Sequence, residues 1–404
     1  MVDGFALPDN VARLRKARNL SQEQLAEATL VGVDTIGRIE RGIRRNVRPE
    51  TLARLARALG TTPLELLGAA TRTASAIDAG LLRRGIAALD DIDDVLDPAE
   101  DQDLRSIGQL SSSGRRAWVS YVAGRTEDLL IELPPLLSDA RKLAHTTTGD
   151  ANADAHGVLT LAYRLGAGLA GRVGLNDLAW ISAERALSAS RRSRAPELET
   201  AVSLRYLVWV LVRQGRTLEA EELAIRAAQA IEPRILDRDE DRAGVFGNLL
   251  FNAASAAIAS GHGDRARDYL RVARAAAVRF GQHGRANEAA IFGPRVVGLQ
   301  TVEAAVRMGE PAAALALAKH LSATDRTVPR FWESGHHLHL ARAAIELRHN
   351  REGLAHLTKA RETAPLWSAR QPLGRSLMTS LLERSSRRRD GGFAELAQHF
   401  GAAG

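Results

Sequence analysis

The stretch LSQEQLAEATLVGVDTIGRIERG, residues Leu20–Gly42, predicts two short helices joined by a tight turn. Ser21 followed three positions later by Gln24 makes a capping box, a pattern that begins a helix by satisfying its first free N–H groups. A second helix would run from about Val33 to Arg41 and end at Gly42, because glycine is favoured just after a helix C-terminus. The stretch therefore predicts a helix, a turn and a helix in a small domain.

The flanking segments predict three more helices. One precedes the stretch, with apolar residues at helical spacing after Pro8. Two follow it: one after Pro49 that stops at Gly60, and one that begins with a second capping box formed by Thr62 and Glu65. The residues expected to face the core are Val11, Leu14, Ala17, Leu25, Ala28, Ile36, Ile39, Leu52, Leu55, Ala56 and Leu59.

Five short helices, with the second and third joined by a tight turn, resemble the Xre-type (lambda-repressor-like) DNA-binding domain. The resemblance is carried by LSQEQLAEA, TIGRIERG and LARLARALGTTPLELL, and covers about residues 8–68. It implies that the start of the third helix enters the major groove of DNA and that the second helix approaches the DNA backbone. The residues implied to bind DNA are Gln22, Gly32, Val33, Asp34, Thr35, Arg38, Arg44, Arg45, Asn46 and Arg48.

The charge around the third helix supports the same interpretation on physical grounds. Between Arg38 and Arg48 the chain has five arginines and one acid, Glu40. Clustered arginines favour contacts with DNA phosphates. A merely solvated loop is the alternative for these residues.

The sequence departs from the family pattern in two ways. Leu30 occupies the place of the family's turn glycine, and the left-handed conformation strains a branched residue, which favours a different turn there. Gly32, Val33 and Asp34 stand where Ser, Arg or Gln is more usual. Val33 suits a thymine methyl group, and Asp34 either accepts from a cytosine amino group or only caps the third helix. The operator sequence does not follow from these residues.

The composition predicts an all-α chain. Of its 404 residues, 45% are hydrophobic and only 4% aromatic, and alanine and leucine, which favour helix, dominate. The net charge of +7 points to a polyanionic partner. This indication is weak, because an excess of arginine is also typical of a GC-rich genome. The lack of cysteine excludes disulfides, thiolate zinc sites and a cysteine nucleophile. With no membrane-length apolar stretch and no signal-peptide pattern, we expect a cytoplasmic, nucleoid-associated protein that does not contact a membrane.

A linker is expected between residues 69 and 114. It would contain a helix of about Ile77–Leu89 and the acidic run DDIDDVLDPAED, which lacks the pattern of a calcium loop. This run is interpreted as solvated, with a contact to the basic DNA-binding surface as the alternative. LSSSGRR at 110–116 predicts a break or a helix edge.

From about residue 115 the chain repeats a small residue or asparagine followed by alanine five positions later. The pairs are Gly174/Ala179, Gly215/Ala220, Gly261/Ala266, Gly309/Ala314 and Asn350/Ala355. They are separated by 41, 46, 48 and 41 residues, and longer amphipathic segments precede them. These units resemble tetratricopeptide repeats, which are stacked helix hairpins. We therefore expect an irregular α-solenoid over 115–404 that serves ligand or partner binding and dimerisation, with a non-repeating helical bundle as the alternative.

The concave surface of a solenoid, lined by the first helix of each hairpin, is a common site for peptides. Candidate ligand-binding residues on the expected first helices are Arg205, Trp209, Asn248, Asn252, Phe292 and Arg295. Core packing is the alternative for the aromatic residues, and exposed or capping amides for the two asparagines. His336, His337 and His339 suggest a metal site only weakly, because no further ligand cluster accompanies them, so no metal is expected.

The whole arrangement resembles bacterial, largely actinobacterial, regulators with an Xre-type N-terminal domain and a tetratricopeptide-like body; FGPRVVGLQTVEAAVRMGEPAAALALA resembles such a body. The resemblance implies a sequence-specific transcriptional regulator that binds a double-stranded DNA operator as a homodimer and senses a peptide, a small molecule or a protein partner. A protein-interaction scaffold whose N-terminal domain is only a tether is the alternative. With no Walker loop, dinucleotide-binding glycine pattern or nucleophile elbow in the sequence, we expect neither an enzyme nor a cofactor.

Overall fold

The computed structural model describes residues 6–43, 47, 49–59, 61, 66, 79–88, 105–233, 239–279, 291–321, 328–384 and 391–402. Within these residues every regular element is helical, which confirms the predicted all-α class. By its contacts the chain divides into two compact units. Met1–Ala74 and His337–Gly404 form the terminal unit, and Ser75–His336 form the solenoid unit. The predicted domain boundaries at 68 and 114 stay predictions.

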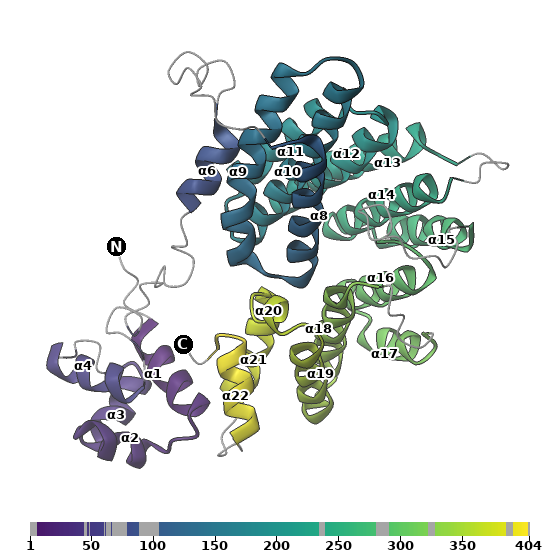
Figure 1. Cartoon of the computed structure of the whole chain (residues 1–404). Coiled ribbons are helices and arrows are strands. Elements are labelled where there is room, and N and C mark those ends of the chain that lie inside the picture. The colour runs from purple at the N-terminus through teal and green to yellow at the C-terminus, as the bar shows by residue number, and fades with distance from the viewer. Residues whose placement is uncertain are drawn as a thin grey trace. The chain divides into compact units, whose positions relative to one another are not determined.

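The terminal unit combines helices from both ends of the chain. We call α1 to α4 the head, and the last four helices the C-terminal segment. The helices are α1 (Ala6–Ala17), α2 (Gln22–Thr29), α3 (Val33–Glu40), α4 (Pro49–Ala58), the second half of α18 (Arg330–Glu346), α19 (Asn350–Thr363), α20 (Pro365–Ser368), α21 (Pro372–Arg384) and α22 (Gly391–His399) (Figure 1).

The head has its own apolar core. The predicted core residues that the structure confirms as buried are Val11, Leu14, Leu25, Ile36, Ile39, Leu52, Leu55, Ala56 and Leu59. The prediction for Ala28 is wrong: its side chain is exposed, because α2 buries Leu25 and, one turn later, Thr29. Gly37 on α3 is also buried. The side chain of Ala17 and most of the predicted fifth helix lie outside the described residues.

The solenoid unit is built from helix hairpins that follow one another from α8 to α17 (Figure 1). Its helices are α6 (Ala79–Ala87), α8 (Ile107–Ala123), α9 (Thr126–Thr146), α10 (Gly149–Arg172), α11 (Asn176–Ser190), α12 (Pro196–Arg213), α13 (Thr217–Ala230), α14 (Glu240–Ala259), α15 (Gly263–Arg279), α16 (Pro294–Arg307), α17 (Pro311–Lys319) and the first half of α18. First helices of successive hairpins pack together, α8 with α10, α10 with α12 and α12 with α14, as in tetratricopeptide arrays. The break predicted at 110–116 is wrong, because this stretch lies inside α8.

The predicted small residues mark the hairpin turns. Four of them have positive φ and precede the second helix of their hairpin by two residues: Gly174, Gly215, Gly261 and Gly309. The alanines five positions later are fully buried where the two helices meet: Ala179, Ala220, Ala266 and Ala314. The fifth pair was predicted two residues out of register. Arg348 (φ 64°) takes the turn position and Gly353 the buried one, whereas Ala355 is exposed, because α19 begins at Asn350.

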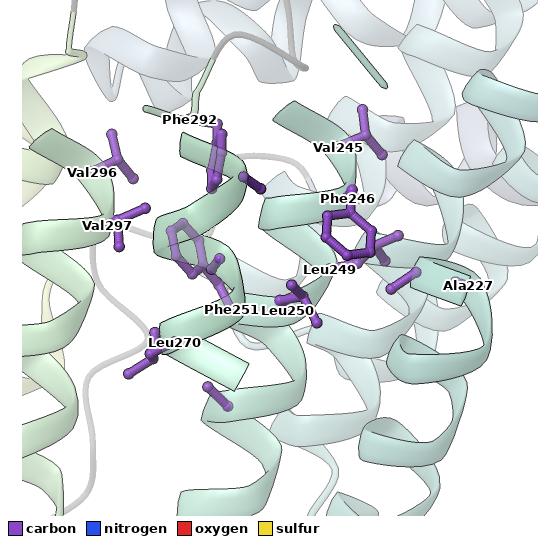
Figure 2. Close-up of a cluster of buried hydrophobic side chains, with 14 of the residues drawn as sticks. Ala227, Val245, Phe246, Leu249, Leu250, Phe251, Leu270, Phe292, Val296 and Val297 are labelled. Atoms are coloured by element: carbon purple, nitrogen blue, oxygen red, sulfur yellow. The ribbon is translucent and has the colours of Figure 1, made fainter. Parts of the chain in front are cut away.

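A large apolar core joins the middle hairpins (Figure 2). Phe292 lies just before α16, with its ring 5.4 Å from the ring of Phe251 on α14. The Phe292 ring also lies against Gly247, where an added Cβ would be 1.9 Å from its tip. Glycine is therefore required at 247 for the aromatic ring to reach the helix backbone.

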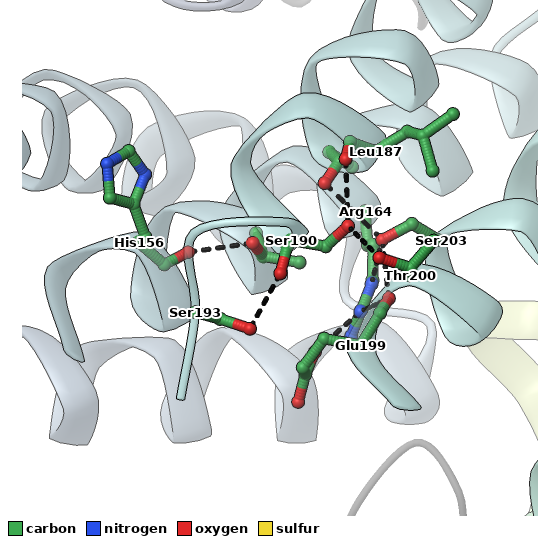
Figure 3. Close-up of polar contacts among 10 residues, drawn as sticks. His156, Arg164, Leu187, Ser190, Ser193, Glu199, Thr200 and Ser203 are labelled. Atoms are coloured by element: carbon green, nitrogen blue, oxygen red, sulfur yellow. Dashed lines mark hydrogen bonds and ion pairs between the residues drawn. The ribbon is translucent and has the colours of Figure 1, made fainter. Parts of the chain in front are cut away.

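A buried arginine ties α10 to α12 in the solenoid unit (Figure 3). Arg164 on α10 has 3% of its side chain exposed and donates to the Ser203 hydroxyl at 3.0 Å and to the Glu199 carboxylate at 2.5 Å, both on α12. The hydroxyls of Ser190, on α11, and Thr200 are 3.2 Å apart beside it. A buried guanidinium needs such partners because desolvating it is costly.

Candidate nucleic-acid interface

The N-terminus of α2 has the predicted capping box. The Ser21 hydroxyl accepts from the Gln24 N–H at 3.1 Å, and the Ser21 N–H donates to the Gln24 side chain at 2.9 Å. A hydrogen bond from Ser21 also holds the pKa of Glu23 below its ordinary value, as suits an acid in the first turn of a helix. The capping box thus fixes the point at which α2 begins.

The turn between α2 and α3 contains a residue in the left-handed backbone conformation, although that residue is a leucine and not a glycine. Leu30 has φ 54° and ψ 37°, and Val31 N–H bonds to Ala26 C=O at 3.2 Å, as in a glycine-ended helix. The sequence favoured a different turn here, and that prediction is wrong, because the same terminal hydrogen bonds form with leucine at the strained position. The Leu30 side chain is 83% exposed.

Helix α3 is closed at its C-terminus as predicted. Gly42 has φ 71°, its N–H bonds to Ile39 C=O at 2.9 Å, and Ile43 N–H bonds to Arg38 C=O at 3.0 Å. Ile36 and Ile39 are fully buried. One side of this short helix is thus held in the head core.

The opposite side of α3, which we call the outer face, consists of Val33, Asp34 and Arg38. Val33 is 39% exposed, and the Asp34 and Arg38 side chains are 72% and 57% exposed. The helix is capped by Gly32 without a side-chain bond, so Asp34 does not act as its cap; instead its carboxylate lies 3.0 Å from Arg38 Nε. Thr35 is half-buried beside this face. The outer face therefore presents a methyl group, an acceptor and a cation to solvent.

Gln22 belongs to a buried polar cluster that ties α2 to α1 and α3. Its amide donates to Glu40 Oε2 at 2.7 Å, and Arg15 donates to both Glu40 oxygens at 2.6 and 2.9 Å. Arg15 also donates to Leu20 C=O at 2.8 Å. Only 13% and 7% of the Arg15 and Glu40 side chains are exposed. The cluster fixes the angle between the helices and holds Gln22 at the start of α2. The sequence did not lead to Arg15 or to its pairing with Glu40. The available indication was that Glu40 is the one acid among the arginines between Arg38 and Arg48.

The predicted phosphate-contacting loop falls outside the described residues. Arg44, Arg45, Asn46 and Arg48 all lie there. Among the described neighbours, Arg41 is exposed and its guanidinium lies beside Gly37.

The candidate ligand residues of the solenoid unit are not gathered around one open site. Asn248 is buried and donates to Gly244 C=O and Ile291 C=O, each at 3.1 Å, while Asn252 donates to Asn248 C=O at 2.8 Å. Both amide groups therefore bond to the backbone of the unit itself.

The other candidates are also engaged within the unit. Phe292 is a core residue that precedes α16 rather than lying on it, which corrects its predicted place on a first helix. Arg295 makes a two-bond ion pair with buried Glu333 at 2.9 and 2.7 Å. Arg205 lies 4.8 Å from the Tyr206 ring. The half-buried Trp209 carries the Arg213 guanidinium 4.9 Å from its ring, and burial lowers the pKa of Arg213.

The histidines near α18 do not form a metal site. His337 Nδ1 lies 3.2 Å from His356 Nδ1, with ring centroids 5.4 Å apart, so the two imidazoles meet nitrogen to nitrogen. Within the described part of the chain, no group of three or more His, Asp or Glu side chains is placed to bind a metal ion. None of the described helices is both long and apolar enough to span a membrane.

Comparison with known proteins identifies only the N-terminal part. Residues 11–66 match the helix-turn-helix family model. No curated protein matches the chain. Among solved structures, the chain is similar to Bacillus thuringiensis PlcR in complex with the peptide PapR7 and DNA, with 12% identity and a TM-score of 0.39, over 85% of this chain and 98% of that one. The chain therefore carries a helix-turn-helix domain at residues 11–66, which includes most of the head.

Proposed function

We propose that the protein is a sequence-specific DNA-binding transcriptional regulator that reads its operator with the outer face of α3. The observation that supports this most directly is the two-sidedness of that helix: Ile36 and Ile39 anchor it, while Val33, Asp34 and Arg38 stand free of the core. The helix-turn-helix match at residues 11–66 supports DNA binding independently.

Each group on the outer face suits a base edge in the major groove. Arg38 is the group for guanine, whose O6 and N7 accept from a guanidinium, and Asp34 for the amino group of cytosine. The Val33 methyls suit the thymine methyl. The Arg38–Asp34 ion pair does not prevent this, because an exposed pair is worth only about 0–1 kcal/mol.

Contacts with the DNA backbone would orient this face. Gln22 lies at the N-terminus of α2, where free N–H groups favour a phosphate. The proposed phosphate contacts of the loop after α3 are Arg44, Arg45, Asn46 and Arg48. Gly32 and Thr35, at the start of α3, are proposed to lie at the edge of the major groove.

The active species in this proposal is a homodimer whose two heads bind half-sites about 34 Å apart on a near-palindromic operator. The solenoid unit would bind a peptide, a small molecule or a protein partner. Arg205, Trp209 and Asn252, which are half-buried, are the candidates that reach the surface of the first helices. A ligand would change operator affinity only if it binds more tightly to one arrangement of the heads.

The test is selection of binding sites from random double-stranded DNA by the full-length protein, followed by affinity measurements with Arg38→Ala. Arg271→Ala is the matched control, because Arg271 pairs with Asp268 on an exposed helix of the solenoid unit as Arg38 pairs with Asp34. We expect an enriched motif with inverted repeats. Arg38→Ala should lose about 1–3 kcal/mol of discrimination at one base pair, and Arg271→Ala none. No enriched motif would refute sequence-specific binding and favour the tether alternative, whereas an enriched motif with equal effects of the two variants would refute base reading by Arg38.

A further inference from the structure

The two ends of the chain meet on the side of α1 that faces away from the head core. Leu7, Val11 and Leu14 turn toward that core. Arg13 and Lys16 point instead to the C-terminal segment, which packs on α1 through α21 and α22. Two cations of α1 thus make polar contacts with the C-terminal segment.

Both cations meet the C-terminal end of a helix. Gly401 (φ 64°) ends α22 with bonds from Gly401 N–H to Gln398 C=O at 3.0 Å and from Ala402 N–H to Ala397 C=O at 2.9 Å. The carbonyl of Ala402, just beyond this cap, accepts from the Arg13 guanidinium. A cation is favoured there because a helix carries partial negative charge at its C-terminus.

Lys16 makes the equivalent contact with the neighbouring helix. Its ammonium lies 3.4 Å from Glu383 C=O, one of the last carbonyls of α21, which have no partner within the helix. Arg13 and Lys16 are three residues apart on α1, so they share one side of the helix. One helix of the head therefore supplies a cation to each of two helix ends.

Charged side chains of α21 act on Arg13 in opposite senses. Burial lowers the pKa of Arg13, Arg375 lowers it further, and Glu383 acts in the opposite sense. The Arg375 guanidinium lies at the same helix end, beside Gly401. Reversing the charge at position 13 should therefore weaken the contact, because a carboxylate would face the partial negative charge of a helix C-terminus.

Docking leaves the outer face of α3 uncovered. In the full chain Asp34, Arg38 and Leu30 remain exposed, although α1 is in contact with the C-terminal segment. The contact therefore does not act by covering the outer face of α3.

We propose that α21 and α22 form a docking seat for the helix-turn-helix head, held by Arg13 and Lys16, and that docking sets the affinity for operators with two half-sites. A docked head already has a fixed orientation relative to the C-terminal segment. A released head loses orientational entropy when two half-sites are occupied together, which lowers the affinity. The DNA consequence rests on the proposed function; the docking itself does not.

Docking is tested by cross-linking, because the chain has no cysteine of its own. In the full-length protein, Lys16→Cys/Glu383→Cys is treated with a short bismaleimide; this pair gives up the Lys16 contact and leaves Arg13 to hold the docked head. It is compared with Glu27→Cys/Glu383→Cys, whose Glu27 is exposed on α2. We expect efficient cross-linking in the first pair, little in the control, and a clear drop when Arg13→Glu is added to the first pair. Equal yields in all three would overturn the docking seat.

The DNA consequence is tested with operators that contain one or two half-sites. Arg13→Glu should weaken binding to the two-half-site operator on the order of tenfold, a typical coupling between sites, and leave the single half-site unchanged. Arg13→Lys should retain most of the affinity, and the cross-linked protein all of it. Equal losses of affinity on both DNAs would mean that Arg13 contacts DNA itself. Unchanged affinity on both would mean that docking has no effect on DNA binding. Either result refutes the proposal. If the parent protein binds neither DNA, the proposed function fails, while the cross-link yields still decide the docking.

Discussion

The buried cluster around Glu40 permits a quantitative test of how the head is held together. Three donors converge on its two carboxylate oxygens: Arg15 Nε on Oε1, and Arg15 Nη2 and Gln22 Nε2 on Oε2. Glu40→Gln keeps the shape of the side chain but leaves only one acceptor oxygen and turns an NH2 group toward these donors. The Arg15 cation then remains in a largely desolvated place without its counter-charge.

The expected cost follows from that geometry. Removing one partner of a buried ion pair costs about 3–5 kcal/mol, and the lower end applies because 13% of the Arg15 side chain still reaches water and Arg15 keeps its bond to Leu20 C=O. A loss of about 3 kcal/mol is roughly a hundredfold increase in the opening of the head. Hydrogen exchange of peptides from α1 to α3 measures this opening directly, since unfolding of a chain with several units is not a single transition.

A matched control separates burial from charge. Asp34→Asn removes the carboxylate of an exposed pair with Arg38 in the same domain and should cost about 0.5 kcal/mol or less. Arg15→Met combined with Glu40→Leu should cost less than the sum of the two single changes, because the double variant leaves no lone buried charge, whereas each single change leaves one. If Glu40→Gln accelerates exchange no more than Asp34→Asn does, the cluster does not hold the head together.

Three further predictions concern single positions. Leu30→Gly should slow hydrogen exchange in the head by stabilising it by about 0.5–1 kcal/mol, because glycine relieves the left-handed strain at φ 54° at some entropic cost. Gly247→Ala should lower the melting temperature of the solenoid unit at a cost of about 1–3 kcal/mol, because the new methyl would meet the Phe292 ring. Burial, and then Arg192, lower the pKa of His156 below 6.5. The folded state therefore binds a proton at His156 less readily than the unfolded state does. The free energy of unfolding should be highest above pH 6.5 and should decrease as the pH falls toward the lowered pKa. His156→Leu should reduce that decrease.

Each of these predictions has a control. Leu30→Ala keeps a Cβ in the strained turn and should not stabilise the head; equal gains from both changes would contradict the strain argument. Adding Phe292→Leu to Gly247→Ala should recover part of the stability, and no recovery would mean that the ring is not the obstacle. If the loss of stability with acidification is the same in His156→Leu, burial of His156 does not cause it.

The head was largely predictable because its signals are local. The Ser21–Gln24 capping box, the glycine at 42 and the spacing of Ile36 and Ile39 each act within a few residues, where backbone hydrogen bonds and helical period leave few alternatives. The hairpin turns followed for the same reason, from glycines at positive φ. Where a non-glycine residue took that conformation, as Arg348 did, the local signal failed and the repeat was placed out of register.

The candidate ligand residues show the limit of helical pattern alone. Asn248 and Phe292 have the right residue types for a binding surface, yet the amide bonds to the Ile291 carbonyl and the ring fills the space above Gly247. Which side of a first helix faces solvent depends on the segment that packs on it from more than forty positions away along the chain. The residues close to Asn248 in the sequence do not indicate which distant segment packs on this helix.

By itself, then, the sequence determined the helices, their caps, the helix-turn-helix domain and the repeated hairpins, because these follow from interactions between close neighbours. Only the tertiary structure decided how distant charges pair: Arg15 with Glu40, 25 positions apart, and Arg13 with Ala402, 389 positions apart. Arginines are abundant in this chain, and each can pair with any acid or free helix end within reach. The choice among them is made by packing of the apolar cores, which brings particular helix ends together and leaves the outer face of α3 open.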